Sequence, residues 1–114
     1  MSNRIQRVES LIQEELGKIL LRNVEFSAGV LVTITRVEAS VDLANARVYI
    51  GVLPQTESKK ILGILNKIVY ALQKTLNKRL RMRPIPKIRF IEEKETGRAA
   101  RVEELLEELK KEEK

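Results

Sequence analysis

The residues of this chain best suited to chemistry are lysines and arginines gathered in one segment. Ten of them, and no acidic residue, lie between Ser58 and Ile91. The chain contains no histidine and no cysteine. It therefore lacks the side chains most often used for proton transfer near neutral pH, for thiolate chemistry and for ligation of transition metals. We expect no enzymatic activity, no cofactor, no metal and no small-molecule substrate, whereas a segment this one-sided is typical of proteins that bind phosphate groups.

The basic residues of this segment share one side of a helical pattern. Apolar residues recur with helical period from Glu57 onward, and about 100° of rotation per residue places eight of them in an arc of about 120°: Ile61, Leu62, Leu65, Ile68, Val69, Leu72, Leu76 and Leu80. A second arc, almost opposite, holds five cations that we call the basic stripe: Lys60, Lys67, Lys74, Lys78 and Arg81. The stripe predicts a nucleic-acid-binding surface. A lysine face that merely keeps the protein soluble is the alternative.

An arginine-rich segment, Arg79-Leu80-Arg81-Met82-Arg83, follows the stripe and precedes two prolines. Continued helical rotation would turn Arg79 and Arg83 into the apolar face, where a charge is costly. Prolines cannot continue a helix, so we expect the helix to loosen near Lys78. If extended, the three arginines would share a side and present planar donor groups to phosphate oxygens. A solvated helix end that interacts with the helix dipole is the alternative.

Tyrosines and acidic residues add weaker signals. Tyr70 lies at the margin of the stripe, where it could stack on an unpaired base or cover the edge of the core. The same two alternatives apply to Tyr49, which is predicted to point away from the core side of a strand. Asp42, the only aspartate, is expected at a turn, where its carboxylate bonds nearby backbone N–H groups. For the glutamates at 92, 93 and 95 we expect ordinary solvation rather than magnesium binding.

Hydrophobic periodicity predicts the elements that must position these residues. The predicted elements are a helix over 5–20, strands over 30–39, 46–52 and 87–91, the helical stretch from Glu57, and a marginal amphipathic helix over 98–114. The first two strands should form a hairpin around 40–42. Strand alternation places Ala46, Val48, Ile50 and Val52 toward the core, as it does Ile88 and Phe90, with Lys87 and Arg89 facing outward.

A chain of 114 residues is expected to form one core. We divide it into an RNA-binding domain over 1–96 and a charged amphipathic helix or partly disordered tail over 97–114. No apolar run approaches the ~20 residues of a spanning helix, and the first residues lack a signal-peptide core. We therefore expect a cytoplasmic protein with no membrane partner. We also expect a monomer.

The predicted order of helix, strand, strand, basic helix or kinked helix pair, and strand resembles the type II KH fold, an α+β class. No Gly-x-x-Gly occurs in the helical region. Three segments resemble bacterial ribosome-binding factor A, in that family's order and spacing: 4–8 (RIQRV), 32–49 (VTITRVEASVDLANARVY) and 76–90 (LNKRLRMRPIPKIRF). Gly97 followed by VEELL at 102–106 resembles the usual ending of that family, so the similarity covers nearly the whole chain.

The resemblance implies a KH-like domain that binds the immature small ribosomal subunit and contacts its rRNA. Members of that family assist late processing and maturation of this rRNA and leave before translation begins, without acting as enzymes. At the matching positions, rRNA contacts are implied for Lys78, Arg79, Arg81 and Arg83. Lys67 and Lys74 join this set from the helical wheel alone, and Tyr70 from its capacity to stack.

One position departs from the family pattern. The family usually has Ala-x-Gly where its helix kinks, whereas this chain has Ile68-Val69-Tyr70. Because the conformational freedom of glycine is lost there, we expect a milder bend or a continuous helix. Two other functions stay open, namely a general RNA-binding or protein-interaction module that docks through 98–114, and sequence-tolerant DNA binding.

Overall fold

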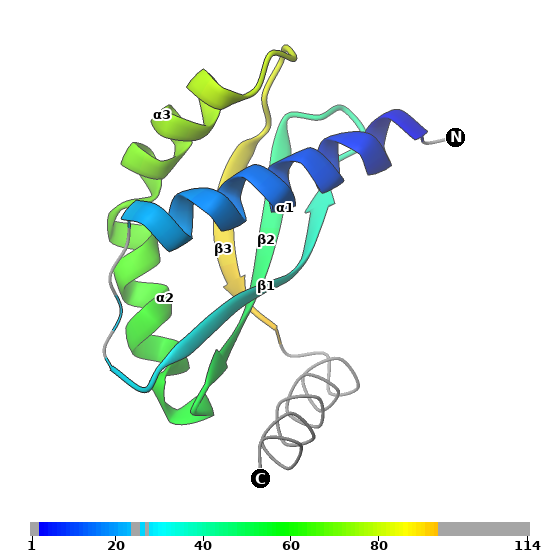
Figure 1. Cartoon of the computed structure of the whole chain (residues 1–114). Helices are drawn as coiled ribbons and strands as arrows, with labels where there is room; N and C mark the ends of the chain where they lie inside the picture. The colour runs from blue at the N-terminus through cyan, green and yellow to red at the C-terminus, as the bar shows by residue number, and fades with distance from the viewer. Residues whose placement is uncertain (1–2, 24–25, 27, 94–114) are drawn as a thin grey trace, which may run out of the picture.

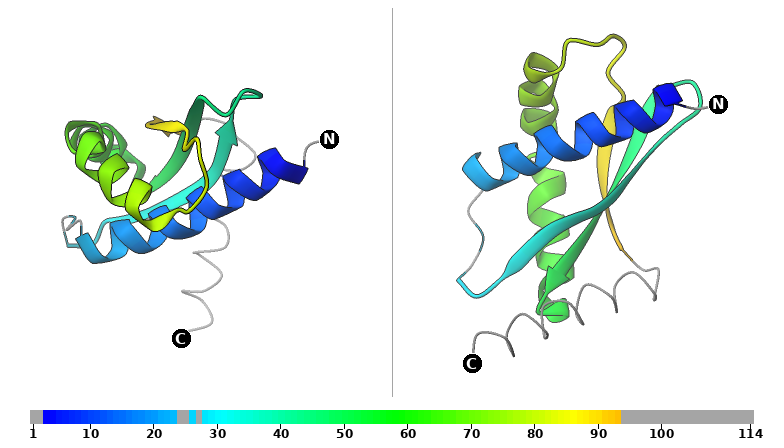
Figure 2. Two further views of the ribbon diagram at one scale, coloured as in Figure 1. Left: turned by 90° about the horizontal axis from the view of Figure 1, so that it is seen from above. Right: turned by 45° about the vertical axis from the view of Figure 1, so that its right-hand side comes forward.

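The computed structural model describes residues 3–23, 26 and 28–93, which form an α+β arrangement of two layers. The helices cover one face of a three-stranded sheet (Figures 1 and 2). In chain order the elements are α1 (Asn3–Asn23), β1 (Leu31–Ala39), β2 (Asn45–Leu53), a short 3-10 turn (Gln55–Glu57), α2 (Ser58–Lys67), α3 (Val69–Arg79) and β3 (Lys87–Glu92). This KH-like order confirms the predicted fold class. None of the described helices is both long and apolar enough to cross a membrane.

The sheet is built on β2, its central strand. β1 pairs with β2 antiparallel, and β3 pairs with β2 parallel. Val48 and Ile50 are fully buried, and the other residues predicted to face the core are at most 5% exposed. These buried side chains lie under the helices, because successive strand residues point to opposite faces. The other face, which we call the open face, carries Arg47, Tyr49, Lys87 and Arg89.

The turn between β1 and β2 is organised by Asp42. Its Oδ1 accepts hydrogen bonds from the Ser40 hydroxyl at 2.6 Å and from the Ala44 backbone N–H at 3.1 Å. These bonds stabilise the ionised carboxylate, so they lower the pKa of Asp42, the Ser40 hydroxyl contributing most. Leu43 follows with φ +58° and a buried side chain. The predicted role of Asp42 in a hairpin turn is confirmed.

The helical stretch after β2 is interrupted at Ile68. α2 ends at Lys67, Ile68 has φ −105° and ψ 9°, and α3 begins at Val69. Of the two alternatives expected here, a milder bend and a continuous helix, the continuous helix is therefore wrong. Glycine is not needed at this interruption, because φ stays negative, in a region that any L-residue can adopt. Ile68 still donates its N–H to the Ile64 carbonyl at 3.3 Å, so one residue separates two helices that remain linked.

The end of α3 agrees with the loosening predicted near Lys78. α3 ends at Arg79, and Leu80 is extended with φ −94° and ψ 135°. The Leu80 side chain is buried in the core. The chain therefore leaves the helix where Leu80 is anchored, before Arg83, which continued helix would have turned inward. Arg79 is still helical and exposed, so the prediction that helical rotation would turn it into the apolar face is wrong.

Glu93 differs from its expected state. Its side chain is fully buried, and its Oε2 accepts hydrogen bonds from Arg36 Nε and the Thr35 hydroxyl, both at 2.8 Å. A buried carboxylate needs such partners, so the prediction of ordinary solvation is wrong for Glu93. The predicted helix over 98–114, its boundary at 97 and Glu95 lie outside the described residues.

A side chain of α3 binds the backbone at the start of the outer edge of β3. Gln73 Oε1 accepts the Ile88 backbone N–H at 2.8 Å, and Gln73 Nε2 donates to the Pro86 carbonyl at 3.1 Å. An edge strand otherwise leaves such groups without partners. Gln73 therefore links α3 to the sheet, and with it the lysines that α3 carries.

We predict that Gln73→Met, which keeps the side-chain length and removes both hydrogen bonds, lowers the free energy of unfolding by about 1–3 kcal/mol. The cause is the Ile88 N–H, which would be left without a partner. Chemical denaturation measures the change. Asn77→Ala is the control, because Asn77 is exposed and bonds Gln73 but not β3. Equal stabilities of the two variants would contradict this account of β3.

Candidate nucleic-acid interface

The basic stripe is carried by two helices and the segment that follows them. Lys60 and Lys67 lie on α2, Lys74 and Lys78 lie on α3, and Arg81 comes after the end of α3. All five side chains are exposed. Of the eight apolar residues predicted to face the core, five are buried and three are partly buried against the same core; the first group is Ile61, Leu65, Leu72, Leu76 and Leu80, and the second is Leu62, Ile68 and Val69. The predicted division into an apolar packing face and a charged outer face is confirmed. It is formed by two helices that are separated at Ile68, whereas the prediction assumed a single helix.

The charges of the stripe are not compensated within the described part of the chain. The salt bridges recorded there involve Lys18, Arg36, Arg47 and Arg79, and none includes a stripe residue. Exposed cations without a carboxylate partner attract polyanions and release counterions when they bind. The stripe is therefore electrostatically suited to a phosphate backbone.

Tyr70 lies within this charged surface. It is 77% exposed on the first turn of α3, so the alternative in which it covers the edge of the core is wrong. The Lys74 ammonium lies 6.0 Å from the centre of the Tyr70 ring, at the outer limit of a cation–π contact. An exposed aromatic ring beside a cation can stack on an unpaired base while the cation meets a phosphate.

The interruption at Ile68 adds a helix N-terminus to the same surface. Lys67 precedes it and Tyr70 follows it. The first N–H groups of a helix lack intrahelical acceptors, and the helix dipole makes this end electropositive. Because α2 ends at the same point and the C-terminal end of a helix carries the opposite partial charge, the two helix ends offset each other, and the lysines supply the positive charge of this surface.

The three arginines near the end of α3 are not equivalent. Arg79 Nη1 donates to Glu15 Oε1 of α1 at 3.0 Å, and this hydrogen bond is the main cause of the lowered pKa of Glu15. Arg83 Nη1 donates to the Met82 and Leu80 carbonyls at 2.7 and 3.2 Å. Only Arg81 has no recorded polar contact among the described residues. Arg79 and Arg83 therefore each use one nitrogen atom to stabilise the end of α3.

Sequence reasoning missed a cluster on the open face. The Arg36 guanidinium lies 3.7 Å from the centre of the Tyr49 ring, and the Tyr49 hydroxyl donates to Glu38 Oε1 at 3.0 Å. The hydrogen bond with Glu93 is the main cause of the raised pKa of Arg36. Arg36 and Glu93 are 57 residues apart, and no local pattern marks them as partners. Because Arg36 covers one face of its ring, Tyr49 is less suited to stacking than Tyr70.

Comparison with known proteins relates this surface to one family. The family model described as ribosome-binding factor A matches residues 4–106. Ribosome-binding factor A of Chlorobium limicola is 38% identical over 114 aligned residues, which cover 97% of this chain and 95% of that protein. The protein of the same name from Thermodesulfovibrio yellowstonii is 35% identical over 108 aligned residues, with 95% and 92% covered.

Two solved structures have the same fold. A Thermotoga maritima protein, described from its solution NMR structure as a candidate ribosome binding factor A, is 35% identical with a TM-score of 0.69, covering 83% of this chain and 92% of its own. The crystal structure of ribosome-binding factor A from Thermus thermophilus gives a TM-score of 0.68 at 23% identity, covering 77% and 94%, and supports the fold alone. From the match over residues 4–106 and these relatives, the chain belongs to the ribosome-binding factor A family.

Proposed function

We propose that this protein binds the immature small ribosomal subunit through its rRNA, assists late processing and maturation of that RNA, and leaves before translation begins. It acts in the cytoplasm, as a monomer, by binding rather than by catalysis. The observation that carries the proposal is the exposed basic stripe on α2 and α3, whose cations have no recorded carboxylate partner among the described residues. The relatives' name, ribosome-binding factor A, supports the choice of the ribosome as the target.

The predicted site residues divide by the contacts they make. Lys67, Lys74, Lys78 and Arg81 meet phosphates, because they are exposed and carry unpaired charge. Tyr70 stacks on an unpaired base, which requires single-stranded or looped RNA, since bases inside a duplex already stack on each other. Arg79 and Arg83 hold the end of α3 with one donor nitrogen each and use their other N–H groups for RNA.

Binding of this kind is readily reversible. Each phosphate neutralised on a single strand contributes about −0.7 to the slope of log K against log salt concentration. Four cations therefore give an affinity that depends strongly on salt and on the number of phosphates within reach. A rearrangement of rRNA that moves a few phosphates away from the stripe would release the protein, as an assembly factor requires.

We expect the tagged protein to cosediment in sucrose gradients with immature small subunits and not with translating ribosomes. The reason is that maturation changes the rRNA surface that the stripe recognises. Gradients from cells blocked in assembly and from growing cells measure this distribution. Equal association with both pools, or with neither, would rule out the proposed role.

We expect the triple charge reversal Lys74→Glu, Lys78→Glu and Arg81→Glu to abolish RNA binding and cosedimentation while the fold stays intact. All three side chains are exposed, so thermal denaturation should be close to that of the wild type. A matched control reverses Arg4, Arg7 and Lys59, which are also exposed and change the net charge equally. If the control loses binding as well, only overall charge matters and the stripe is a solubility feature.

A comparison of Tyr70→Ala with Lys74→Gln separates stacking from charge. We expect Tyr70→Ala to weaken binding of a 20-nucleotide single-stranded RNA by about 1–3 kcal/mol with an unchanged salt slope. Lys74→Gln should reduce that slope by about 0.7. Tyr70→Phe is the control, because it keeps the ring.

Competition with duplex DNA of the same length tests the alternative of DNA binding, which predicts a preference for the duplex.

A further inference from the structure

The pairing of β2 with β3 places cations side by side on the open face of the sheet. In this parallel pair Arg47 is opposite Arg89, and Asn45 is opposite Lys87. Their neighbours Ala46, Val48, Ile88 and Phe90 are buried under the helices, so the charged side chains belong to the other face. Like charges directly opposite each other destabilise a sheet. A bound anion would offset the repulsion between these two charges.

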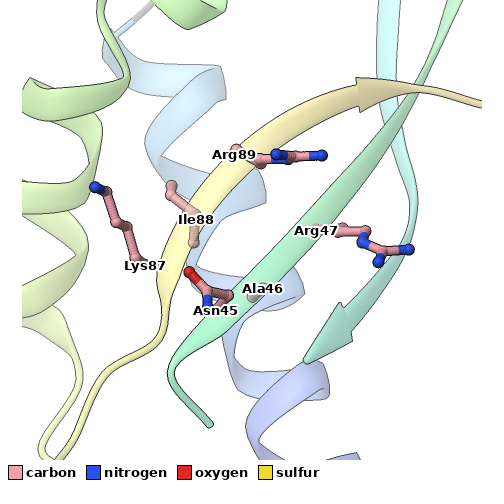
Figure 3. A pocket seen from close by; sticks show the side chains of 6 residues that line it. All are labelled: Asn45, Ala46, Arg47, Lys87, Ile88 and Arg89. Carbon is pink, nitrogen blue, oxygen red and sulfur yellow. The ribbon is translucent and has the colours of Figure 1, made fainter. Parts of the chain in front are cut away.

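These residues surround a hollow in the surface. It has a volume of about 430 Å³ and is lined by Asn45, Ala46, Arg47, Lys87, Ile88 and Arg89. Figure 3 shows Arg47 and Arg89 extending in the same direction from neighbouring strands, whereas Lys87 leans toward the green helices. The lining thus combines two guanidinium groups, one ammonium group and one amide, with no carboxylate. Guanidinium groups present paired N–H donors that match phosphate oxygens.

The charge of this hollow is only partly balanced by its surroundings. The one recorded ion pair of Arg47 is with Glu38 Oε1 at 3.9 Å, and the Tyr49 hydroxyl and Arg36 share the same carboxylate. For Lys87 and Arg89 no ion pair is recorded within the described ranges. Arg47, Lys87 and Arg89 are all exposed, so an anion from solution can reach them.

The hollow also lies next to the basic surface already described. The Lys87 N–H donates to the Ala44 carbonyl at 3.0 Å, which joins the start of β3 to the β1–β2 turn. The segment from Arg79 to Lys87 runs directly from the end of α3 into β3. This segment and the β1–β2 turn lie at the same end of the molecule (Figure 1). A polyanion that leaves the stripe near Arg81 would therefore meet the hollow next.

We propose that Arg47 and Arg89 form a second phosphate-binding site, on the open face of the sheet, which takes the backbone of the same RNA that binds the basic stripe. This inference rests on the proposed function, because it requires RNA at the stripe. The bound strand would pass over the end of the sheet, with its backbone on Arg47 and Arg89 and with Lys87 and Asn45 at the rim. The RNA is then held on both sides of one sheet.

The test is the double variant Arg47→Gln/Arg89→Gln, assayed with a 20-nucleotide single-stranded RNA at several salt concentrations. We expect the Kd at 0.1 M salt to rise about 5-fold per arginine and the salt slope to fall by about 1.4, because two phosphates lose their partners. Lys59→Gln/Arg7→Gln is the control, since it removes the same charge from two exposed residues outside the hollow. Arg47→Lys/Arg89→Lys keeps the charge and should keep the wild-type slope. If the double glutamine variant fails to fold, the single variants Arg47→Gln and Arg89→Gln replace it, and each should lower the slope by about 0.7.

The possible outcomes separate this site from the stripe. A Kd and slope equal to those of the control, with Lys74→Gln still reducing the slope, would overturn the second site and leave the proposed function standing. Failure of the wild type to bind RNA would overturn both. If the double variant binds the RNA normally but no longer cosediments with immature subunits, the open face contacts a protein and the phosphate site is excluded.

Discussion

Burial of the apolar sides of α2 and α3 against the sheet is the constraint on which the charged surface depends. Ile61, Leu65 and Leu76 are almost completely buried, and their exposure would cost about 1.5–3 kcal/mol each. This burial determines the rotation of both helices about their axes, so the lysines one or two residues away in the sequence point to the opposite side and face solvent. The cations need no specific contacts of their own to be positioned. Their order along the surface follows from the packing behind them.

Two features adapt this packing to a surface that binds. The interruption at Ile68 allows α2 to pack against β3 while α3 also contacts α1. The Gln73 side chain accepts the Ile88 N–H of β3 and donates to the carbonyl of Pro86, just before the strand. The first feature is a change in backbone conformation, and the second is a pair of side-chain hydrogen bonds; both lie beside the apolar contacts. They position α3 without involving any cation of the basic stripe.

The open face is organised differently, by charge rather than by burial. Arg36 joins β1 to Glu93 just after β3, and it covers Tyr49 on β2 between them. One buried carboxylate therefore links the outer strands across the central one. Arg47 touches this cluster through Glu38 and Tyr49, and the parallel register places Arg89 opposite Arg47. Cations are thus held on both sides of a thin sheet, which suits a nucleic acid that passes around one end of it.

The sequence by itself determined the order of the elements, the core-facing residues of β2 and β3, the charged side of the helices and the turn at Asp42. These features depend on local periodicity and on single residue types, which a linear pattern records. Only the tertiary structure decided that Ile68 interrupts the helix, that Arg79 pairs with Glu15, and that Arg36 pairs with Glu93. Each depends on residues distant in the chain or on a backbone region open to every residue type. For the same reason the sequence did not predict that Arg47 lies opposite Arg89, since strand register is set by the packing of the whole sheet.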